Sequence, residues 1–156
     1  MRSSSISRRL FLAGAATAAL AHPAAAQTLP EVTVTKDPSC GCCGAWVDHM
    51  RAEGFPVTVR EAPVNPLKVK LGVPRDLASC HTSQVGGYVV EGHVPAAAVK
   101  RLLASKPDTL GIAVAGMPVG SPGMEVEGTE PDTYEVVQFG PKGRSTFARF
   151  RGASEL

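Results

Sequence analysis

The sequence predicts an α/β domain built around a mixed β-sheet. Val32–Thr35 alternates apolar and polar residues, as a half-buried strand does. A helix is expected after the cysteine-rich turn that follows, and Phe55–Arg60 returns to strand-forming residues. Because strand, helix and strand fall within about thirty residues, they predict a βαβ unit whose two strands are parallel neighbours.

The elements of this first unit are bounded by residues that begin or end regular structure. We expect the first strand at Glu31–Lys36 and the first helix at Ala45–Glu53, with Gly54 as its C-terminal stop. Trp46 and Met50 lie four positions apart on one side of that helix, which predicts that this side faces the core.

A second, shorter helix is predicted after the second strand. Asn65 is the expected N-cap and Pro66 the expected first helical residue, because both residue types are favoured at those positions. The helix then runs over Leu67–Leu71 and ends at Gly72. Val73–Leu77 is expected to form a turn or a single helical turn.

A hairpin and a third helix come next. Gln84–Val90 supplies strand residues, and Glu91-Gly92 is the predicted turn of the hairpin. Pro95 then opens a helix over Ala96–Ala104, since proline is favoured where a helix starts.

The last third of the chain combines a long loop with a second hairpin. Residues 106–128 are rich in glycine and proline and hold two methionines, which argues against a helix or a central strand. Tyr134–Phe139 and Arg144–Arg151 flank a Gly140–Gly143 turn and predict the hairpin. The complete order is that of a thioredoxin-like domain: a central mixed sheet flanked by helices, with a C-terminal Gly/Pro/Met loop and a β-hairpin extension.

The first 26 residues predict an export signal rather than part of the domain. Ser7–Leu12 contains the paired arginines of a twin-arginine signal, an alanine-rich run follows, and Ala24–Ala26 forms a small-residue cleavage site. The apolar run is too short for a permanent membrane span, and a buried amphipathic helix is the alternative interpretation. We expect residues 1–26 to be cleaved and residues 27–156 to reach the periplasm.

Charge and composition exclude one large class of function. Three of the sixteen basic residues fall in the leader, which leaves thirteen against fourteen acidic residues, a net charge of −1. No lysine and arginine cluster is interleaved with aromatic residues, so a nucleic-acid partner is not expected.

Three of the four cysteines lie together in the turn before the first helix. Cys40 and Cys43 have the C-x-x-C spacing of thiol–disulfide oxidoreductases, and a helix N-terminus stabilises a thiolate over a thiol. Cys42 has no part in such a pair. Cys42 and Cys43 are adjacent and would pair only in a strained ring, so a structural disulfide framework explains the cluster poorly. Thiolates select soft metals such as Cu(I), zinc or iron–sulfur clusters.

The fourth cysteine strengthens the prediction of a metal site. Cys80 precedes the third predicted strand. In a thioredoxin-like chain, the loop at this position lies against the cysteine turn and usually carries a cis-proline. Here no proline precedes Thr82, which weakens a role in dithiol exchange. Cys40, Cys42, Cys43 and Cys80 are therefore the predicted ligands. A small buried hydrophobic residue is the alternative interpretation of Cys80.

Further side chains are candidates for the same site. His81 is either a ligand or a hydrogen-bond partner that orients one. His93 is favoured as a surface or capping residue, with a ligand role as the alternative. Met117 and Met124 can offer thioethers from the Gly/Pro loop or fill gaps in the packing. His49, on the first helix, is expected to face solvent.

Four segments carry a resemblance to a known family: residues 36–46, 77–82, 87–95 and 116–124. They resemble a bacterial family of small exported metal-binding proteins, catalogued as a domain of unknown function, which includes the CopG-like proteins of copper-resistance clusters. The resemblance implies a thioredoxin-like fold and copper held by the four cysteines as a multinuclear Cu(I)–thiolate cluster. It also implies a role in copper redox conversion or handling in the periplasm, with a copper donor or acceptor protein as partner.

Two other functions stay open at this point. A thiol–disulfide oxidoreductase would use Cys40 and Cys43, and a zinc or iron–sulfur module would use the same four sulfurs. The residues do not decide whether the protein is an enzyme.

Overall fold

The computed structural model describes residues 28–156. The predicted leader and its cleavage site therefore lie outside the described residues. Within residues 28–156, no helix has both the length and the apolar character needed to cross a membrane.

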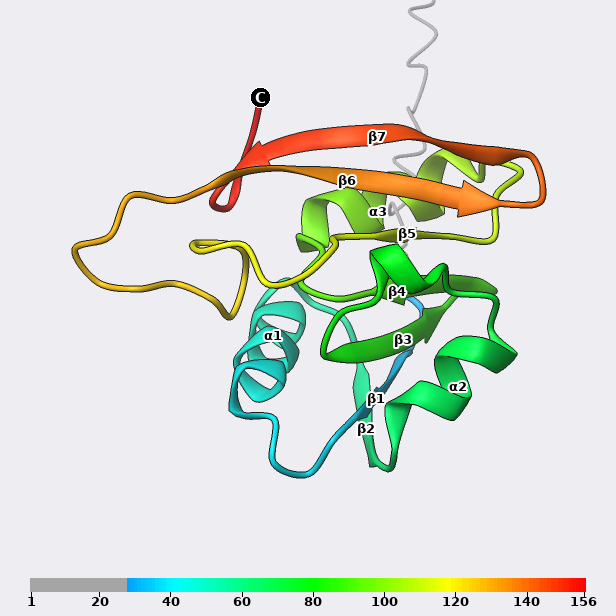
Figure 1. The fold of residues 1–156 in the computed structure, drawn as a ribbon, viewed down its shortest axis with the longest axis horizontal. Helices are drawn as coiled ribbons and strands as arrows, with labels where there is room; N and C mark the ends of the chain where they lie inside the picture. Colours follow the sequence, from blue (N-terminus) through cyan, green and yellow to red (C-terminus); the bar gives the residue numbers. More distant parts are fainter. Residues whose placement is uncertain (1–27) are drawn as a thin grey trace, which may run out of the picture.

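The described chain is a mixed α/β structure with one eight-stranded sheet (Figure 1). The strand order is β2-β1-β3-β4-β5-β6-β7-β8. The pairs β1–β2 and β4–β5 are parallel and the other neighbours antiparallel, which confirms the predicted βαβ unit. The strands are β1 (Val32–Lys36), β2 (Val57–Glu61), β3 (His81–Val85), β4 (Tyr88–Glu91), β5 (Gly111–Ala113), β6 (Thr133–Gly140), β7 (Gly143–Arg151) and β8 (Ser154–Glu155).

Three α-helices accompany the sheet among the described residues: α1 (Gly41–Ala52), α2 (Val64–Lys70) and α3 (Ala96–Ser105). The predicted single helical turn is a 3₁₀ turn at Arg75–Leu77. Helix α1 starts four residues earlier than expected, because Gly41 and Gly44 occupy its first turn instead of a loop. This shift places the cysteines inside the helix start.

The predicted N-cap of α2 is wrong. The helix begins at Val64 with Pro63 as N-cap, so Asn65 and Pro66 lie within its first turn. Proline is tolerated there because the first backbone N–H groups of a helix have no intrahelical acceptor.

The turn of the first hairpin also differs from the prediction. Gly86 and Gly87 form it, both with positive φ (55° and 88°), and Val85 pairs with Tyr88. Two glycines admit the left-handed conformations that suit the twist of a two-residue hairpin. Glu91, predicted in a turn, is instead the last residue of β4 and is fully buried.

The predicted long loop contains a strand that the sequence did not reveal. Strand β5 is three residues long and fills the gap between β4 and β6. The second hairpin, β6–β7, is confirmed, with a bulge at Val136/Val137. The segment from Val114 to Asp132 is irregular apart from turns, and runs past α1 (yellow in Figure 1).

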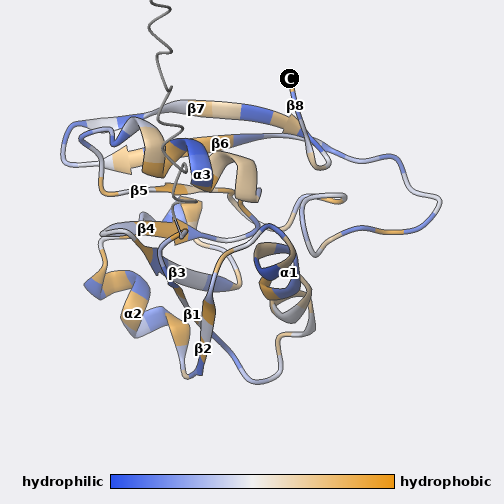
Figure 2. Cartoon of the chain, turned by 180° about the vertical axis from the view of Figure 1, so that it is seen from behind, coloured by the Kyte–Doolittle hydropathy of each residue, from blue (hydrophilic) through white to orange (hydrophobic). Residues whose placement is uncertain are grey.

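Two clusters of buried apolar side chains hold the sheet and helices together. The larger joins Trp46 and Met50 of α1 and Leu102 of α3 to strand residues such as Val34. The smaller joins Leu77 to Val89, Ala113 and Phe139. Val89 and Val90 are neighbours in β4 but belong to different clusters, as expected for residues on opposite faces of a sheet. Figure 2 shows the resulting alternation of hydrophobic and hydrophilic segments along α1 and α2.

Candidate metal centre

The first turn of α1 holds three cysteines. Cys40 is the N-cap residue, Cys42 and Cys43 follow within the turn, and Cys40 and Cys43 form a disulfide. Residues three apart lie on the same side of a helix, so the two sulfurs can meet there while Cys42 points elsewhere. The sequence pattern argues against a structural disulfide framework but leaves a Cys40–Cys43 redox pair as an alternative. The structure forms the one pairing that the helix spacing favours and leaves Cys42 as a free thiol.

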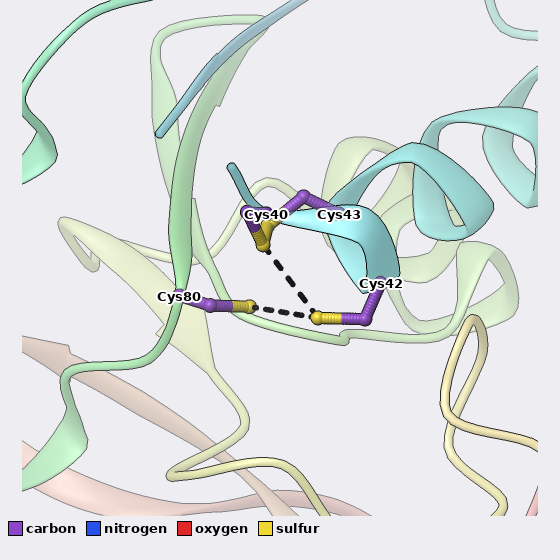
Figure 3. A group of neighbouring side chains, drawn as sticks. All are labelled: Cys40, Cys42, Cys43 and Cys80. Atoms are coloured by element: carbon purple, nitrogen blue, oxygen red, sulfur yellow. Dashed lines mark hydrogen bonds between the residues drawn. A yellow bond between two sulfur atoms is a disulfide. The ribbon is translucent and has the colours of Figure 1, made fainter. Parts of the chain in front are cut away.

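Cys80 lies against this trio, just before β3. Its Sγ atom is 3.9 Å from Cys42 Sγ, and Cys42 Sγ is 3.6 Å from Cys40 Sγ (Figure 3). All four sulfurs lie within 4.8 Å of one another. The cause is the antiparallel pairing of β1 and β3, in which Lys36 is opposite His81. The chain therefore leaves β1 toward the cysteine turn at the same end where it enters β3 through Cys80.

His81 is fully buried beside Cys80. Its Nδ1 atom is 3.3 Å from Cys80 Sγ, and its ring lies 4.6 Å from that of Trp46. Within the described chain, its Nε2 atom has no hydrogen-bond partner. Burial, followed by the neighbouring His93 and Lys68, lowers the pKa of His81 to about 3, so the ring is neutral and one nitrogen keeps a lone pair.

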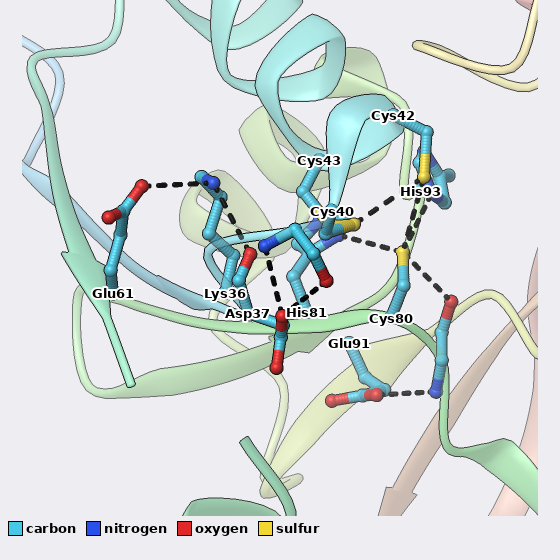
Figure 4. Close-up of a disulfide and its surroundings, with 12 residues drawn as sticks. Lys36, Asp37, Cys40, Cys42, Cys43, Glu61, Cys80, His81, Glu91 and His93 are labelled. Atoms are coloured by element: carbon cyan, nitrogen blue, oxygen red, sulfur yellow. Dashed lines mark hydrogen bonds and ion pairs between the residues drawn. A yellow bond between two sulfur atoms is a disulfide. The ribbon is translucent and has the colours of Figure 1, made fainter. Parts of the chain in front are cut away.

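His93 is buried too, so the predicted surface or capping position is wrong. Its Nε2 atom lies 3.0 Å from Cys80 Sγ (Figure 4). Its Nδ1 atom is 2.9 Å from the carbonyl oxygen of Pro122. Burial lowers the pKa of His93, which favours the neutral ring. A carbonyl only accepts, so Nδ1 donates to Pro122, and the Nε2 lone pair faces the sulfur of Cys80. Cys80, His81 and His93 form a second group of closely spaced potential ligands.

The thiol of Cys80 is protonated at neutral pH in the metal-free protein. Burial, together with the nearby Cys42 thiol, raises the pKa of Cys80 to about 11. Binding of a metal ion would therefore have to displace this proton.

The Gly/Pro loop packs directly on the cysteine turn. Gly123 has a φ of +84°, and a Cβ atom there would lie 2.7 Å from the backbone nitrogen of Trp46 and 2.9 Å from the carbonyl oxygen of Cys42. Met124 follows and is partly buried, whereas Met117 is 52% exposed. The loop thus reaches the site through its backbone at Pro122 and Gly123.

A buried ion pair supports the segment that carries Cys80. Glu91 accepts a hydrogen bond from the backbone N–H of Ser79 at 2.6 Å and pairs with Lys68 Nζ at 2.5 Å. Thr82 donates to the other carboxylate oxygen of Glu91. Sequence analysis missed this pair. The available signal is that Glu91 directly continues the apolar run Val89-Val90, whereas the following Gly92 favours a turn.

His49 does not face solvent as predicted. It is half-buried, and its Nε2 atom accepts a hydrogen bond from the backbone N–H of Ala96 at 3.1 Å. Because Pro95 has no side-chain acceptor to offer to the start of α3, the imidazole of α1 supplies one.

The comparisons with known proteins agree with this geometry. A family model described as "Protein of unknown function, DUF411" matches residues 77–124, and no curated protein matches the sequence. The chain is similar to two solved structures of the copper resistance protein CopG, Form 1 and Form 2, each with 43% identity and a TM-score of 0.73. The matches cover 80% and 78% of this chain and 99% and 98% of the CopG chains, respectively. The chain therefore belongs to the CopG-like family of copper resistance proteins.

Proposed function

We propose that this protein binds copper as Cu(I) through the sulfurs of Cys40, Cys42, Cys43 and Cys80 and serves copper resistance. The observation that carries the proposal is the meeting of four sulfurs, within 4.8 Å, from two segments far apart in the sequence. Thiolates are soft ligands that prefer Cu(I) to hard cations. The similarity to the copper resistance protein CopG supports copper as the metal rather than another soft cation.

The donor set fits a soft cation once the disulfide is reduced. Two electrons and two protons from a thiol reductant convert the Cys40–Cys43 disulfide to two thiols and make all four sulfurs available. The buried Nε2 of His81, which lacks a partner in the described chain, and the Nε2 lone pair of His93 add imidazole nitrogens, which suit copper as well. Copper is the cargo here. Thiolates that bridge ions would let a multinuclear Cu(I) cluster form on few sulfurs, and the mixed S/N surroundings would permit conversion between Cu(I) and Cu(II).

Finer features of fold and location belong to the same proposal. The order β1-α1-β2 followed by β3-β4-α3, with strands arranged β2-β1-β3-β4, supports a thioredoxin-like core extended by β5–β8. The twin-arginine sequence supports cleavage after residue 26 and a periplasmic domain of residues 27–156. In that compartment a copper donor or acceptor protein would be the partner.

One observation favours a second candidate, a thiol–disulfide oxidoreductase. Cys40 and Cys43 are paired at a helix start, which is the arrangement of that class. An oxidoreductase of this kind would reduce insulin at a rate that survives Cys42→Ser and Cys80→Ser. A zinc or iron–sulfur module is distinguished by metal analysis and by the absorption spectrum of protein purified without oxygen.

The test is a competitive titration of the reduced protein with Cu(I) in the absence of oxygen. We expect Cys42→Ser to lose most of the bound copper and to keep the fold, measured by circular dichroism. Ser39→Ala is the matched control, because Ser39 is an exposed neighbour in the same turn and carries no sulfur. Equal copper content in Cys42→Ser, Ser39→Ala and the wild type would overturn the proposal.

A further inference from the structure

We propose that Cys42 and Cys80 are a second redox pair, which can exchange with the Cys40–Cys43 disulfide and which raises the number of electrons the site can release from two to four. This inference concerns the metal-free protein and goes beyond copper binding. It rests on the position of Cys42, whose sulfur lies 3.6 Å from one sulfur of the existing disulfide and 3.9 Å from Cys80, the other free thiol among residues 28–156.

The sulfur positions allow this pair to form with small movements. Cys42 Sγ is 3.9 Å from Cys80 Sγ. An S–S bond is about 2 Å long, so side-chain rotations that bring the two sulfurs about 2 Å closer would let the disulfide form. Both residues are partly exposed, so a small oxidant in solution can reach them. Cys43, in contrast, is fully buried and already paired.

The exchange proceeds in two balanced steps. Cys42 Sγ attacks Cys40 Sγ, 3.6 Å away, so that a Cys40–Cys42 bond forms, the Cys40–Cys43 bond breaks, and Cys43 leaves as a thiolate that takes up the proton lost by Cys42. Cys80 Sγ then attacks Cys42 Sγ. The Cys42–Cys80 bond forms, the Cys40–Cys42 bond breaks, and Cys40 leaves as a thiolate that takes up the proton of Cys80. No electron enters or leaves the protein.

Oxidation from outside uses the same two sulfurs. Cys42 and Cys80 together release two electrons and two protons when their disulfide forms, and two equivalents of a one-electron acceptor such as Cu(II) or hexacyanoferrate(III) take up the electrons. His93 is placed to take the proton of Cys80, because its Nε2 lone pair lies 3.0 Å from the sulfur. The fully reduced site thus releases four electrons to one-electron acceptors.

The consequence is structural as well as chemical. A Cys42–Cys80 disulfide would tie the first turn of α1 to the start of β3, across 38 positions of sequence. With both disulfides formed, no thiol remains as a ligand. If Cys42 and Cys80 could not pair, oxidation of the fully reduced protein would instead stop once the C-x-x-C pair had released two electrons.

The first experiment titrates the metal-free, fully reduced protein with hexacyanoferrate(III) and counts free thiols. Samples are alkylated at acid pH and cut with trypsin, which places Cys40, Cys42 and Cys43 on fragment 37–51 and Cys80 on fragment 76–100. We expect consumption of four oxidising equivalents, no free thiol at the end, and a crosslink between the two fragments in monomeric protein. Consumption that stops at two equivalents, with the thiols of Cys42 and Cys80 still open to alkylation, would overturn the proposal.

A pair of matched variants isolates the two sulfurs. Cys40→Ser/Cys43→Ser keeps Cys42 and Cys80, and we expect it to consume two equivalents and form the intramolecular crosslink. Cys40→Ser/Cys42→Ser keeps the same number of thiols, but one is the fully buried Cys43, and we expect crosslinking at least tenfold slower. Equal rates in the two variants, or dimers alone in the first, would contradict the proposal. Because no copper is present, either result leaves the copper-binding proposal to its own test.

Discussion

His93 connects the Gly/Pro loop to the sulfur of Cys80. Its Nδ1 atom donates to the carbonyl oxygen of Pro122, and its Nε2 atom lies 3.0 Å from Cys80 Sγ. Because both nitrogens of one rigid ring are engaged, a displacement of the loop moves the imidazole relative to the sulfur. The loop is therefore part of the site, although it contributes only backbone atoms to these contacts.

A methyl group at position 123 tests this connection. In Gly123→Ala the new Cβ atom would meet Trp46 and Cys42 backbone atoms, so we expect the loop to be pushed off α1 and the affinity for Cu(I) to fall at least tenfold. Gly128→Ala is the control, because Gly128 has a similar φ of +73° but open space around it. Both variants place alanine at a positive φ and so carry similar backbone strain. Equal Cu(I) affinities of the two variants would show that the contact between the loop and α1 does not affect copper binding.

Removal of the buried cation tests the support under Cys80. Lys68→Met leaves the Glu91 carboxylate buried without its partner, and we expect a loss of about 3–5 kcal/mol in the free energy of unfolding in urea. Lys70 lies on the exposed side of the same helix, so Lys70→Met should change the free energy of unfolding by less than about 0.5 kcal/mol. Adding Glu91→Gln to Lys68→Met removes the unpaired charge and should restore part of the stability. Equal stability of Lys68→Met and Lys70→Met would refute the role of the pair.

Alkylation measures the protonation state of Cys80. The thiolate is the reactive form, and the pKa of Cys80 is raised to about 11, against about 8.5 for an unperturbed thiol. At pH 8 we expect iodoacetamide to modify Cys80 on the order of a hundredfold more slowly in folded than in urea-unfolded protein. The folded rate should keep rising with pH beyond pH 9, where the unfolded rate levels off. Mass spectrometry of fragment 76–100 follows Cys80 alone. Similar alkylation rates in folded and unfolded protein would show that the pKa of Cys80 is not raised.

Acid stability reports on His81. Its pKa is lowered to about 3 in the folded protein, so between pH 6.5 and 3 the unfolded state binds a proton that the folded state does not. Stability must therefore fall as the pH drops through this window, by up to about 1.4 kcal/mol per pH unit. His49 and His93, whose pKa values are also lowered, act in the same direction. We expect the slope to be smaller in His81→Gln, and an unchanged slope would argue against a neutral, buried His81.

The sequence predicted those features that depend on local pattern. Alternation in Val32–Thr35 and the helical spacing of Trp46 and Met50 led to the correct βαβ unit, and the antiparallel pairing of β1 with β3 then accounts for Cys80 beside the trio. The four sulfurs do meet, and their role as copper ligands stays a prediction.

The features that the sequence did not predict depend on residues distant in the chain. His93 resembles a surface residue in the sequence because the groups that its ring nitrogens contact, in Pro122 and Cys80, lie 29 and 13 positions away. The three residues of β5 are too few to show a period, and the strand exists because β4 and β6 lie on either side of it. Glu91 looks like a turn residue in the sequence, because the cation that stabilises its buried carboxylate, Lys68, lies on another element.

X-ray absorption at the copper edge tests the central claim most directly. The measurement uses reduced, Cu(I)-loaded wild-type protein without oxygen and identifies the atoms bound to copper. The account predicts a first shell dominated by sulfur, with at most a minor nitrogen contribution from imidazole. A shell of nitrogen and oxygen alone would contradict it, because the clustered sulfurs would then play no part in holding the metal.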